Sequence, residues 1–332
     1  MTNSLSPMFS LIVLNWNGSR YLPRLFQSLR EQTFRDFEVV LVDNGSTDDS
    51  LDLTRRGFPE VRVVDLGENL GFAESNNRAA ALSTASFLLF LNNDTHLAPD
   101  TLETIVHAAR RQTCVSIWAV QFRSYDGTQF LGYGNAVDVL GFPTGGKLFF
   151  SVGAALVIRR DVFDRLGGFD AHYFMYFEEI DLCWRAWLQG ERIATAPKAV
   201  VYHEGGGSSG SPLIQADSYK TTKFRRRLGH RNQLASILKN YSAAVLPFAL
   251  LLFGSLTAAE AILLTATGQK SVVTEAYVPA WRDLWRDRAH IRAERRKVQA
   301  ARTVGDWTIL RRMEWRLHVV HLFFRTGVPK IN

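Results

Sequence analysis

The chain has 332 residues and a hydrophobic fraction of 46%, which is typical of a globular protein with one large domain or two smaller ones. Its two cysteines, Cys114 and Cys183, lack the spacing of a metal site, which excludes a zinc-cysteine centre and fits a reducing cytosol. The net charge of +7 is uneven, since residues 1–203 are acidic overall while residues 204–332 carry 21 Lys and Arg against 9 Asp and Glu.

The first half of the chain alternates short apolar runs with helical patterns. Apolar runs predict buried strands at 9–14, 37–42, 61–66 and 87–91. Helices are expected after them at about 22–29, from Asp49, at 68–85, and from Pro99 onward. Further strands are expected at 115–122, 149–158 and 199–202. This alternation predicts an α/β fold with a doubly wound, mostly parallel sheet and right-handed crossovers.

The polar triplet Asn92, Asn93 and Asp94 directly follows the apolar run at 87–91. We expect it at the carboxyl end of a central strand, which is where open α/β sheets bind their ligands. A carboxylate beside amide oxygens suits Mg²⁺ or Mn²⁺ and the phosphates that such ions carry. The alternative is a polar turn that caps the next helix, with Pro99 in the first turn of that helix.

Three carboxylates, on Glu178, Glu179 and Asp181, lie at the start of another predicted helix. Asp181 and Arg185 are four residues apart and can pair on one helix face, which leaves the two glutamates without an obvious local partner. A carboxylate among aromatic residues near a metal is a candidate general base, although acidic residues also favour helix starts for electrostatic reasons. His203, at the end of a predicted strand, is either a structural histidine or a metal ligand.

Two common classes of nucleotide-binding enzyme are disfavoured. The first strand is not followed by the Gly-x-Gly-x-x-Gly turn of dinucleotide-binding dehydrogenases. It is also not followed by the long glycine-rich loop with arginine that nucleotidyltransferases of similar architecture use.

With these motifs in place, residues 8–210 resemble the family 2 glycosyltransferases of GT-A fold, and within them the rhamnosyltransferase-like enzymes of bacterial cell-envelope polysaccharide synthesis. The resemblance depends on an ordered set of motifs. They are Val13-Leu14-Asn15-Trp16-Asn17, Val42-Asp43-Asn44-Gly45-Ser46-Thr47-Asp48, Asn69-Leu70-Gly71-Phe72 with Asn76-Asn77, Asn92-Asn93-Asp94, Glu178-Glu179-Ile180-Asp181 with Arg185, and His203.

The resemblance implies a role for each matched position. Asp43 corresponds to the residue that pairs with the nucleotide base, and Asn15, Gly71, Asn77, Asn92 and Asn93 join it as expected donor-nucleotide residues. Asp94 and His203 are expected to bind Mg²⁺ or Mn²⁺, and Asn92 replaces the first aspartate of the family's Asp-x-Asp motif. Glu179 corresponds to the catalytic base, which is usually aspartate, and Glu178, Asp181 and Arg185 support it.

These roles imply an inverting transfer of rhamnose or another hexose from a dTDP- or UDP-linked donor to a hydroxyl of a glycan or lipid-linked glycan. The divalent ion would neutralise the departing diphosphate, and Glu179 would accept the proton of the acceptor hydroxyl. Two other classes are weighed against this enzyme. One is a non-catalytic nucleotide-sugar binder, which Asn92 favours, and the other is a membrane-surface interaction protein.

The basic second half is expected to form a helical C-terminal region, residues 211–332, after a catalytic domain at residues 1–210. Residues 220–239 contain seven Lys and Arg and no acid, and 282–302 form a second basic helix with eight. Between them, 243–267 is mostly apolar but is interrupted by Pro247 and Glu260, so we expect surface association with an anionic membrane or packing as a helical cap. No nucleic-acid motif is present.

The start of the chain, 1–10, lacks the basic region and apolar core of a secretory signal. The expected location is therefore the cytoplasm, peripheral at the inner face of the cell membrane.

Overall fold

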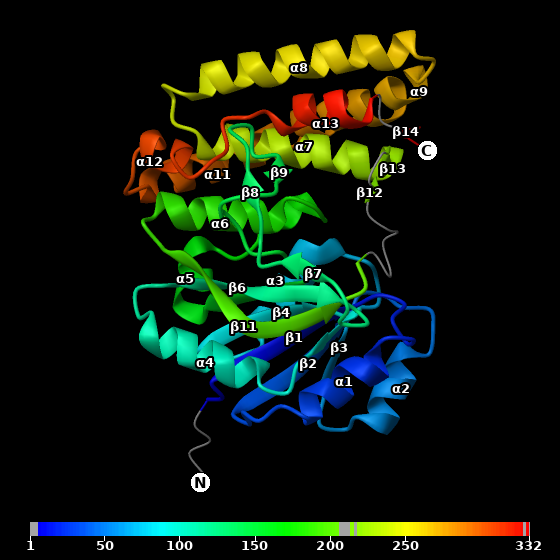
Figure 1. Ribbon diagram of the computed structural model, residues 1–332, viewed down its shortest axis with the longest axis vertical. Coiled ribbons are helices and arrows are strands. Elements are labelled where there is room, and N and C mark those ends of the chain that lie inside the picture. Colours follow the sequence, from blue (N-terminus) through cyan, green and yellow to red (C-terminus); the bar gives the residue numbers. More distant parts are fainter. Residues whose placement is uncertain (1–5, 206–212, 216–217, 328–329, 332) are drawn as a thin grey trace. The chain divides into compact units, whose positions relative to one another are not determined.

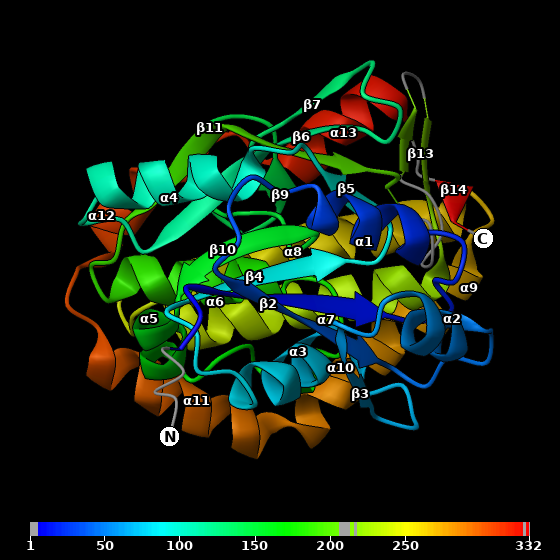
Figure 2. The same ribbon diagram turned by 90° about the horizontal axis from the view of Figure 1, so that it is seen from below.

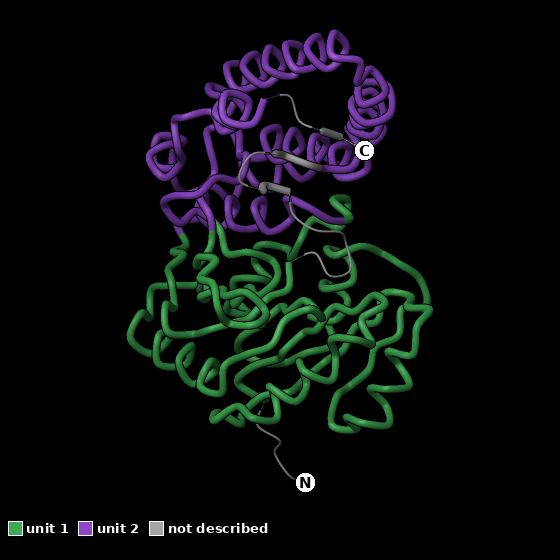
Figure 3. The backbone as a smooth tube through the Cα atoms, turned by 45° about the vertical axis from the view of Figure 1, so that its right-hand side comes forward, with its two compact units in different colours: residues 1–134, 150–174, 191–211 green, residues 135–149, 175–190, 212–332 purple. Residues whose placement is uncertain are grey.

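The computed structural model describes residues 6–205, 213–215, 218–327 and 330–331. The chain divides into two compact units, drawn in different colours in Figure 3. Unit 1 comprises residues 1–134, 150–174 and 191–211, and unit 2 comprises residues 135–149, 175–190 and 212–332. The boundary expected between residues 210 and 211 lies outside the described residues.

Unit 1 is built around a nine-stranded sheet in the order β3-β2-β1-β4-β10-β6-β11-β5, with β7 paired to β6 (Figure 1). The strands are β1 (Phe9–Asn15), β2 (Phe37–Asp43), β3 (Arg62–Asp65), β4 (Phe87–Asn92), β5 (Thr95–Leu97), β6 (Ile117–Ser124), β7 (Phe130–Gly132), β10 (Ala155–Arg159) and β11 (Ile193–His203). Strands β1 to β4 are parallel neighbours, β11 is parallel to β6, and β10 is antiparallel to β4 and β6. The prediction of a doubly wound, mostly parallel sheet is confirmed.

Helices cover both faces of this sheet (Figure 2). They are α1 (Leu22–Arg30), α2 (Ser50–Gly57), α3 (Gly71–Ala81), α4 (Thr101–Arg111) and α5 (Arg160–Leu166), followed by a short 3-10 helix, Ala171–Tyr173. Alternate side chains of each strand point to opposite faces. Leu89 and Leu91 of β4 therefore share one core cluster with α1 and α4. Phe90, between them, packs on the other face against Phe163 and Phe169.

Several expected boundaries in unit 1 are wrong for identifiable reasons. The short strand β5 intervenes between the polar triplet and helix α4, so Pro99 precedes the helix and is not in its first turn. Helix α3 ends at Ala81 and does not reach residue 85. The apolar run at 149–158 contains only the short strand β10, because its first residues form buried loop structure.

Unit 2 is mostly helical. Its helices are α6 (Glu178–Leu188), α7 (Lys223–Asn240), α8 (Leu246–Ala266), α9 (Lys270–Val272), a π-helix at Val273–Tyr277, α10 (Val278–Arg286), α11 (Arg288–Ala301), α12 (Asp306–Leu310) and α13 (His318–Thr326). Short strands β8 (Ala136–Val137), β9 (Pro143–Thr144), β12 (Leu213–Gln215), β13 (Ser218–Thr221) and β14 (Lys330–Ile331) complete it. Helix α7 packs against α6, α8, α10 and α11.

Two expectations for this helical region need correction. Pro247 lies in the first turn of α8, where a missing backbone N–H costs no hydrogen bond, so 246–266 is one uninterrupted helix. The single basic helix expected at 282–302 is divided at Asp287 into α10 and α11. Within the described part of the chain, α8 is the one helix long and apolar enough to cross a membrane, as judged by length and composition alone.

Candidate active site

Polar side chains at the carboxyl ends of β1, β2 and β4 form one hydrogen-bond network. Asn93, in the turn after β4, donates from Nδ2 to Oδ1 of Asn15, 2.9 Å away. Asn15 ends β1 and donates from its own Nδ2 to Oδ1 of Asp43, which ends β2, at 2.7 Å. All three side chains are buried. The structure thus brings three predicted donor-site residues together at one sheet edge, while their contacts with a nucleotide remain a prediction.

Asp43 is completely buried, and protein groups already donate to both of its carboxylate oxygens. Oδ1 accepts from Asn15 and from Oγ of Ser46 at 2.6 Å, and Oδ2 accepts from the Ser46 backbone N–H at 2.8 Å. This geometry supports an organising role for Asp43 more than direct pairing with a base. Beside it, Trp16 follows the end of β1 with 40% of its surface exposed. Trp16 belongs to the motif at 13–17 but had no predicted role, although a tryptophan directly after a strand is a usable signal.

Gly18 is a second site residue that the sequence analysis did not single out. A Cβ atom at this position would lie 2.1 Å from Nδ2 of Asn93 and 2.2 Å from Oδ1 of Asn15. Only a residue without a side chain lets the loop after β1 approach the two amides this closely. A glycine just after a strand end was the available signal, but glycines are common in such loops.

Asp94 and His203 approach each other because β5 pairs antiparallel with β11, with Thr95 opposite His203. Oδ1 of Asp94 lies 3.3 Å from Nε2 of His203, and the two side chains are 4% and 18% exposed. Two ligands each about 2.1 Å from one ion lie about 3 Å apart at a right angle, so this pair fits a shared divalent cation. The described residues contain no group of three His, Cys, Asp or Glu side chains able to hold an ion.

Asn92 is the last residue of β4, and its backbone holds the turn that carries Asn93 and Asp94. Its N–H donates to the carbonyl oxygen of Ala154 at 3.1 Å, and its carbonyl oxygen accepts from Oγ1 of Thr95 at 2.7 Å. The side chain is half-buried. The predicted exchange of an aspartate for Asn92 therefore concerns a residue whose backbone shapes the turn.

Gly71 and Asn77 of α3 hold the segment 169–174 of unit 1. Gly71 has φ +81°, and a Cβ there would lie 2.4 Å from the carbonyl oxygen of Phe174. Asn77 donates to the carbonyl oxygen of Phe169 at 2.8 Å and accepts from its N–H at 2.9 Å. Because the backbone of Phe169 engages both polar atoms of Asn77, this amide has a structural role, and the proposed donor site omits it.

Glu178 and Glu179 begin helix α6 of unit 2 and differ in environment. Glu178 is 5% exposed, whereas Glu179 is half-buried. Burial, followed by the charge of Glu179, raises the pKa of Glu178 well above its ordinary value of 4.5. Tyr176 and Phe177, just before them, have φ values of +71° and +72°, which is strained for residues with side chains. Strain before a pair of carboxyl groups is typical of functional sites.

Asp181 and Arg185 form the expected pair on α6, with Nε of Arg185 2.8 Å from Oδ2 of Asp181. Both side chains are buried. Helix α7 adds contacts that the sequence analysis did not predict. Nζ of Lys239 lies 3.1 Å from the same carboxylate, and Nδ2 of Asn240 donates to its other oxygen at 3.0 Å. The two supporting residues thus belong to a charge cluster that joins α6 and α7.

An aromatic cluster in unit 1 contains His96, two residues after Asp94 in the chain. The His96 ring stacks on Tyr202 at 4.5 Å and meets Tyr125 edge-on at 4.7 Å. Burial, followed by the charge of Arg24, lowers the pKa of His96 to about 4, so the imidazole is neutral near pH 7. His96 is thus an uncharged ring packed among aromatic side chains, whereas His203, the histidine expected to bind metal, lies next to the Asp94 carboxylate.

The sequence of the chain matches a known protein family. Residues 10–181 match the sequence model of Glycosyl transferase family 2. The chain is 30% identical over 237 residues to a PGL/p-HBAD biosynthesis glycosyltransferase of Mycobacterium bovis, covering 68% of this chain and 88% of the relative. It is 26% identical over 242 residues to an N-acetylglucosaminyl-diphospho-decaprenol L-rhamnosyltransferase of Mycobacterium tuberculosis, covering 62% and 79%.

The fold has solved counterparts at low sequence identity. A mannosyltransferase from Pyrobaculum calidifontis in complex with GDP-Man and Mn²⁺ matches with a TM-score of 0.53 and 18% identity. The match covers 90% of this chain and 86% of that one, and shows a shared GT-A fold. The chain therefore belongs to glycosyl transferase family 2.

Proposed function

We propose that the chain transfers rhamnose, or another hexose, from a dTDP- or UDP-linked donor to a hydroxyl of a lipid-linked glycan, with inversion and with the help of Mg²⁺ or Mn²⁺. The observation that carries the proposal is the Asp94–His203 pair, 3.3 Å apart, beside the buried amide network at the same sheet edge. Rhamnose and a lipid-linked acceptor are proposed because the name of the Mycobacterium tuberculosis relative contains both an L-rhamnosyl group and a diphospho-decaprenol acceptor.

The donor site is proposed at the carboxyl ends of β1, β2 and β4. Asn15, Asp43 and Asn93 form the buried floor of this site. The exposed Trp16 can stack on the nucleobase. Base–aromatic stacking stabilises a nucleotide without strong preference among bases. The choice between dTDP and UDP therefore depends on contacts other than Trp16.

The diphosphate is proposed to lie next to Asp94 and His203. These two side chains would hold a divalent cation through one carboxylate oxygen and one imidazole nitrogen. When bound, such an ion supplies positive charge that stabilises the departing diphosphate. The substitution of Asn92 for an aspartate leaves one negative charge fewer, so we expect weaker metal binding than in relatives with two aspartates.

Glu179 is the proposed catalytic base, and the contrast with Glu178 supports the choice. A base must be ionised and accessible, and Glu178 is buried with a raised pKa while Glu179 is half-buried. Glu179 would accept the proton as the acceptor oxygen bonds to the anomeric carbon and the bond to the diphosphate oxygen breaks. One displacement inverts the anomeric centre without a covalent sugar–enzyme intermediate.

The C-terminal helices are proposed to associate with the inner face of the cell membrane, but the structure changes the basis of that proposal. Arg226, Arg227 and Arg231 of α7 form ion pairs with Glu260, Asp283 and Asp287. These arginines are therefore largely neutralised within unit 2. Membrane association is better supported by α8, whose Phe248, Leu251 and Ile262 are each more than 70% exposed. We keep residues 1–210 as the proposed catalytic domain, with 211–332 as the membrane-associating region.

The test is release of nucleoside diphosphate from a panel of sugar nucleotides, with and without Mg²⁺, Mn²⁺ and excess chelator. We expect one preferred donor and loss of turnover with chelator. Asp94→Ala and His203→Ala should each weaken donor binding and metal dependence together. Full activity in chelator would remove the metal from the mechanism. Donor binding without turnover, under every metal condition and with every glycan acceptor, would favour a non-catalytic binder, which Asn92 already suggests.

A further inference from the structure

The segment 175–177 of unit 2 leads directly into the proposed base, and its backbone is strained. Tyr176 and Phe177 have φ values of +71° and +72°, in the left-handed region that residues with side chains disfavour. Such a backbone persists only where surrounding contacts fix it. Glu178 and Glu179 follow directly in the chain. The contacts that hold this segment therefore also set the direction in which helix α6 presents its first carboxylates.

One face of helix α7 supplies these contacts. Arg225, Gly229 and Asn232 lie at positions i, i+4 and i+7, which places them on one side of the helix. The Arg225 guanidinium lies 4.8 Å from the centre of the Tyr176 ring. A Cβ atom on Gly229 would lie 3.7 Å from Cε2 of Phe177, so this ring packs close to the helix backbone. Both rings of the strained segment are thus held against α7.

The side chain of Asn232 holds the backbone of the segment. Its Nδ2 donates to the carbonyl oxygens of Met175 and Tyr176, at 3.0 and 2.7 Å, so both amide hydrogens are used. Its Oδ1 accepts from Nη1 of Arg231 at 2.9 Å, and Arg231 in turn pairs with Asp287. Because Asn232 is completely buried, water cannot replace these bonds if the amide is removed.

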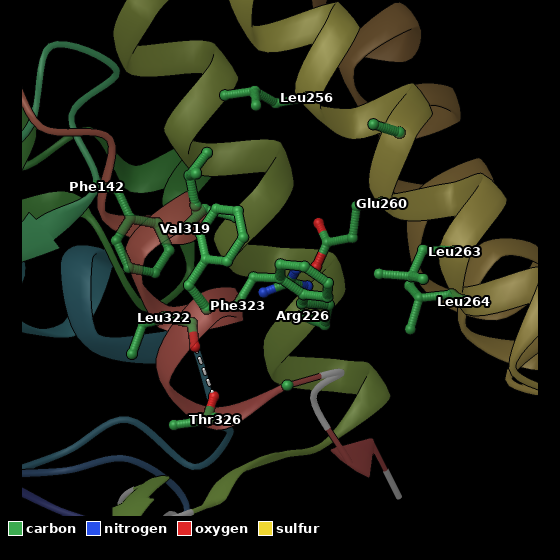
Figure 4. A pocket seen from close by; sticks show the side chains of 14 residues that line it. Phe142, Arg226, Leu256, Glu260, Leu263, Leu264, Val319, Leu322, Phe323 and Thr326 are labelled. Carbon is green, nitrogen blue, oxygen red and sulfur yellow. Dashed lines mark hydrogen bonds and ion pairs between the residues drawn. The ribbon is translucent and has the colours of Figure 1, made fainter.

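Helix α7 is a firm support for this amide, since it packs against α6, α8, α10 and α11. On another face of α7, Arg226 forms an ion pair with Glu260 of α8 at the wall of an apolar cavity of about 250 Å³ (Figure 4). Reacting groups keep their geometry when the side chains behind them are locked on rigid elements. Asn232 has this place behind the segment that carries the proposed base.

We propose that Asn232 is a positioning residue for Glu179, because it fixes the strained segment and so directs the Glu179 carboxylate toward the acceptor hydroxyl. This inference rests on the proposed function, since it has meaning only if Glu179 accepts a proton. Asn232 acts through the start of helix α6 and not by touching the sugar or the diphosphate. A misplacement of about 1 Å in a reacting group is enough to lower a rate roughly a hundredfold.

The experiment measures nucleoside diphosphate release with the preferred donor for the full chain, Asn232→Ala, Glu179→Gln and the double variant. We expect Asn232→Ala to lower kcat by about ten- to a hundredfold, while the Kd of the donor in calorimetry changes by less than about twofold. In the Glu179→Gln background, Asn232→Ala should lower kcat by less than about twofold, because no base remains to be misplaced.

The matched control is Gln233→Ala, at the neighbouring buried amide of α7. Nε2 of Gln233 donates to the carbonyl oxygen of Leu140 at 3.0 Å, away from the segment before the base. Its loss should lower the melting temperature about as much as Asn232→Ala does, but should leave kcat unchanged. If Asn232→Ala does not fold, Asn232→Ser takes its place with the same expected pattern, since one hydroxyl hydrogen serves at most one of the two carbonyls.

Several results would overturn the positioning role while leaving the transferase intact. Equal losses of kcat from Asn232→Ala in both backgrounds would show that the residue acts on the fold and not through Glu179. An unchanged kcat in Asn232→Ala, or an equal loss in Gln233→Ala, would contradict the role as well. The absence of turnover in the unmodified chain with every donor would instead overturn the proposed function, and this inference with it.

Discussion

Lys239 Nζ lies 3.1 Å from Oδ2 of Asp181, and both side chains are almost completely buried. Arg185 pairs with the same oxygen, so two cations from α7 and α6 meet one carboxylate. The proposed base, Glu179, lies in the same helical turn as Asp181. Part of the basic run interpreted as a membrane anchor therefore holds the helix on which catalysis is proposed to depend.

We predict that Lys239→Met destabilises the protein by about 2 kcal/mol, because the buried Asp181 carboxylate loses one charged hydrogen-bond partner and keeps only Arg185 and Asn240. Urea denaturation followed by circular dichroism measures the loss. The matched control is Lys297→Met, since Lys297 pairs with Glu294 but is 74% exposed, and its effect should stay within about 0.5 kcal/mol. Equal effects of the two substitutions would contradict a stabilising role for Lys239.

For the base, we predict that Glu179→Gln lowers turnover by roughly 10²-fold or more, since the amide keeps the shape but cannot accept a proton. Donor affinity, measured by calorimetry, should change little. The control is Glu178→Gln, which should cost only a few-fold because that carboxyl already retains its proton to higher pH. Near-normal turnover in Glu179→Gln, with a large loss in Glu178→Gln, would show that Glu178 is the catalytic base and that Glu179 supports it.

The raised pKa of Glu178 makes a prediction about stability against pH. The folded state holds this proton to higher pH than the unfolded state, whose carboxyl has the ordinary value of 4.5. Stability from this group is therefore present below pH 4.5 and is lost as pH rises through the raised pKa. The glutamine of Glu178→Gln cannot ionise. The difference in melting temperature, variant minus unmodified chain, should therefore increase as pH rises above 4.5. Parallel melting curves across this range would show that Glu178 is not buried in solution.

The sequence predicted those features that depend on local pattern. Unbroken apolar runs located the strands of the sheet, and the polar triplet after β4 predicted the edge at which the amide network lies. The Asp181–Arg185 pair followed from helical spacing alone. These features need no knowledge of which distant segments meet.

Features that depend on distant segments were not predicted. Lys239 and Asp181 are 58 residues apart, and nothing in either segment indicates the partner. Likewise, the sequence alone predicts a free basic surface on α7. The structure shows that three of its arginines pair with Glu260 of α8, Asp283 of α10 and Asp287 between α10 and α11. Asn77 matched a family motif, but only the structure shows its amide on the backbone of Phe169.

Finally, we predict that Gly18→Ala disrupts the donor site. The new methyl group would lie within 2.2 Å of both Asn93 Nδ2 and Asn15 Oδ1, so at least one amide must move and the hydrogen bond between them is lost. We expect a loss of about 1–3 kcal/mol in stability, as for overpacking, and at least tenfold weaker binding of the donor nucleotide in calorimetry.

The matched control for this change is Gly57→Ala at the end of α2, where a Cβ meets nothing within 4 Å. Alanine is the better helix former, so Gly57→Ala should be neutral or slightly stabilising and should leave donor binding unchanged. If Gly18→Ala binds the donor as tightly as Gly57→Ala does, the amide network is not part of the nucleotide site, and Asn15, Asp43 and Asn93 would serve only to hold the strand ends together.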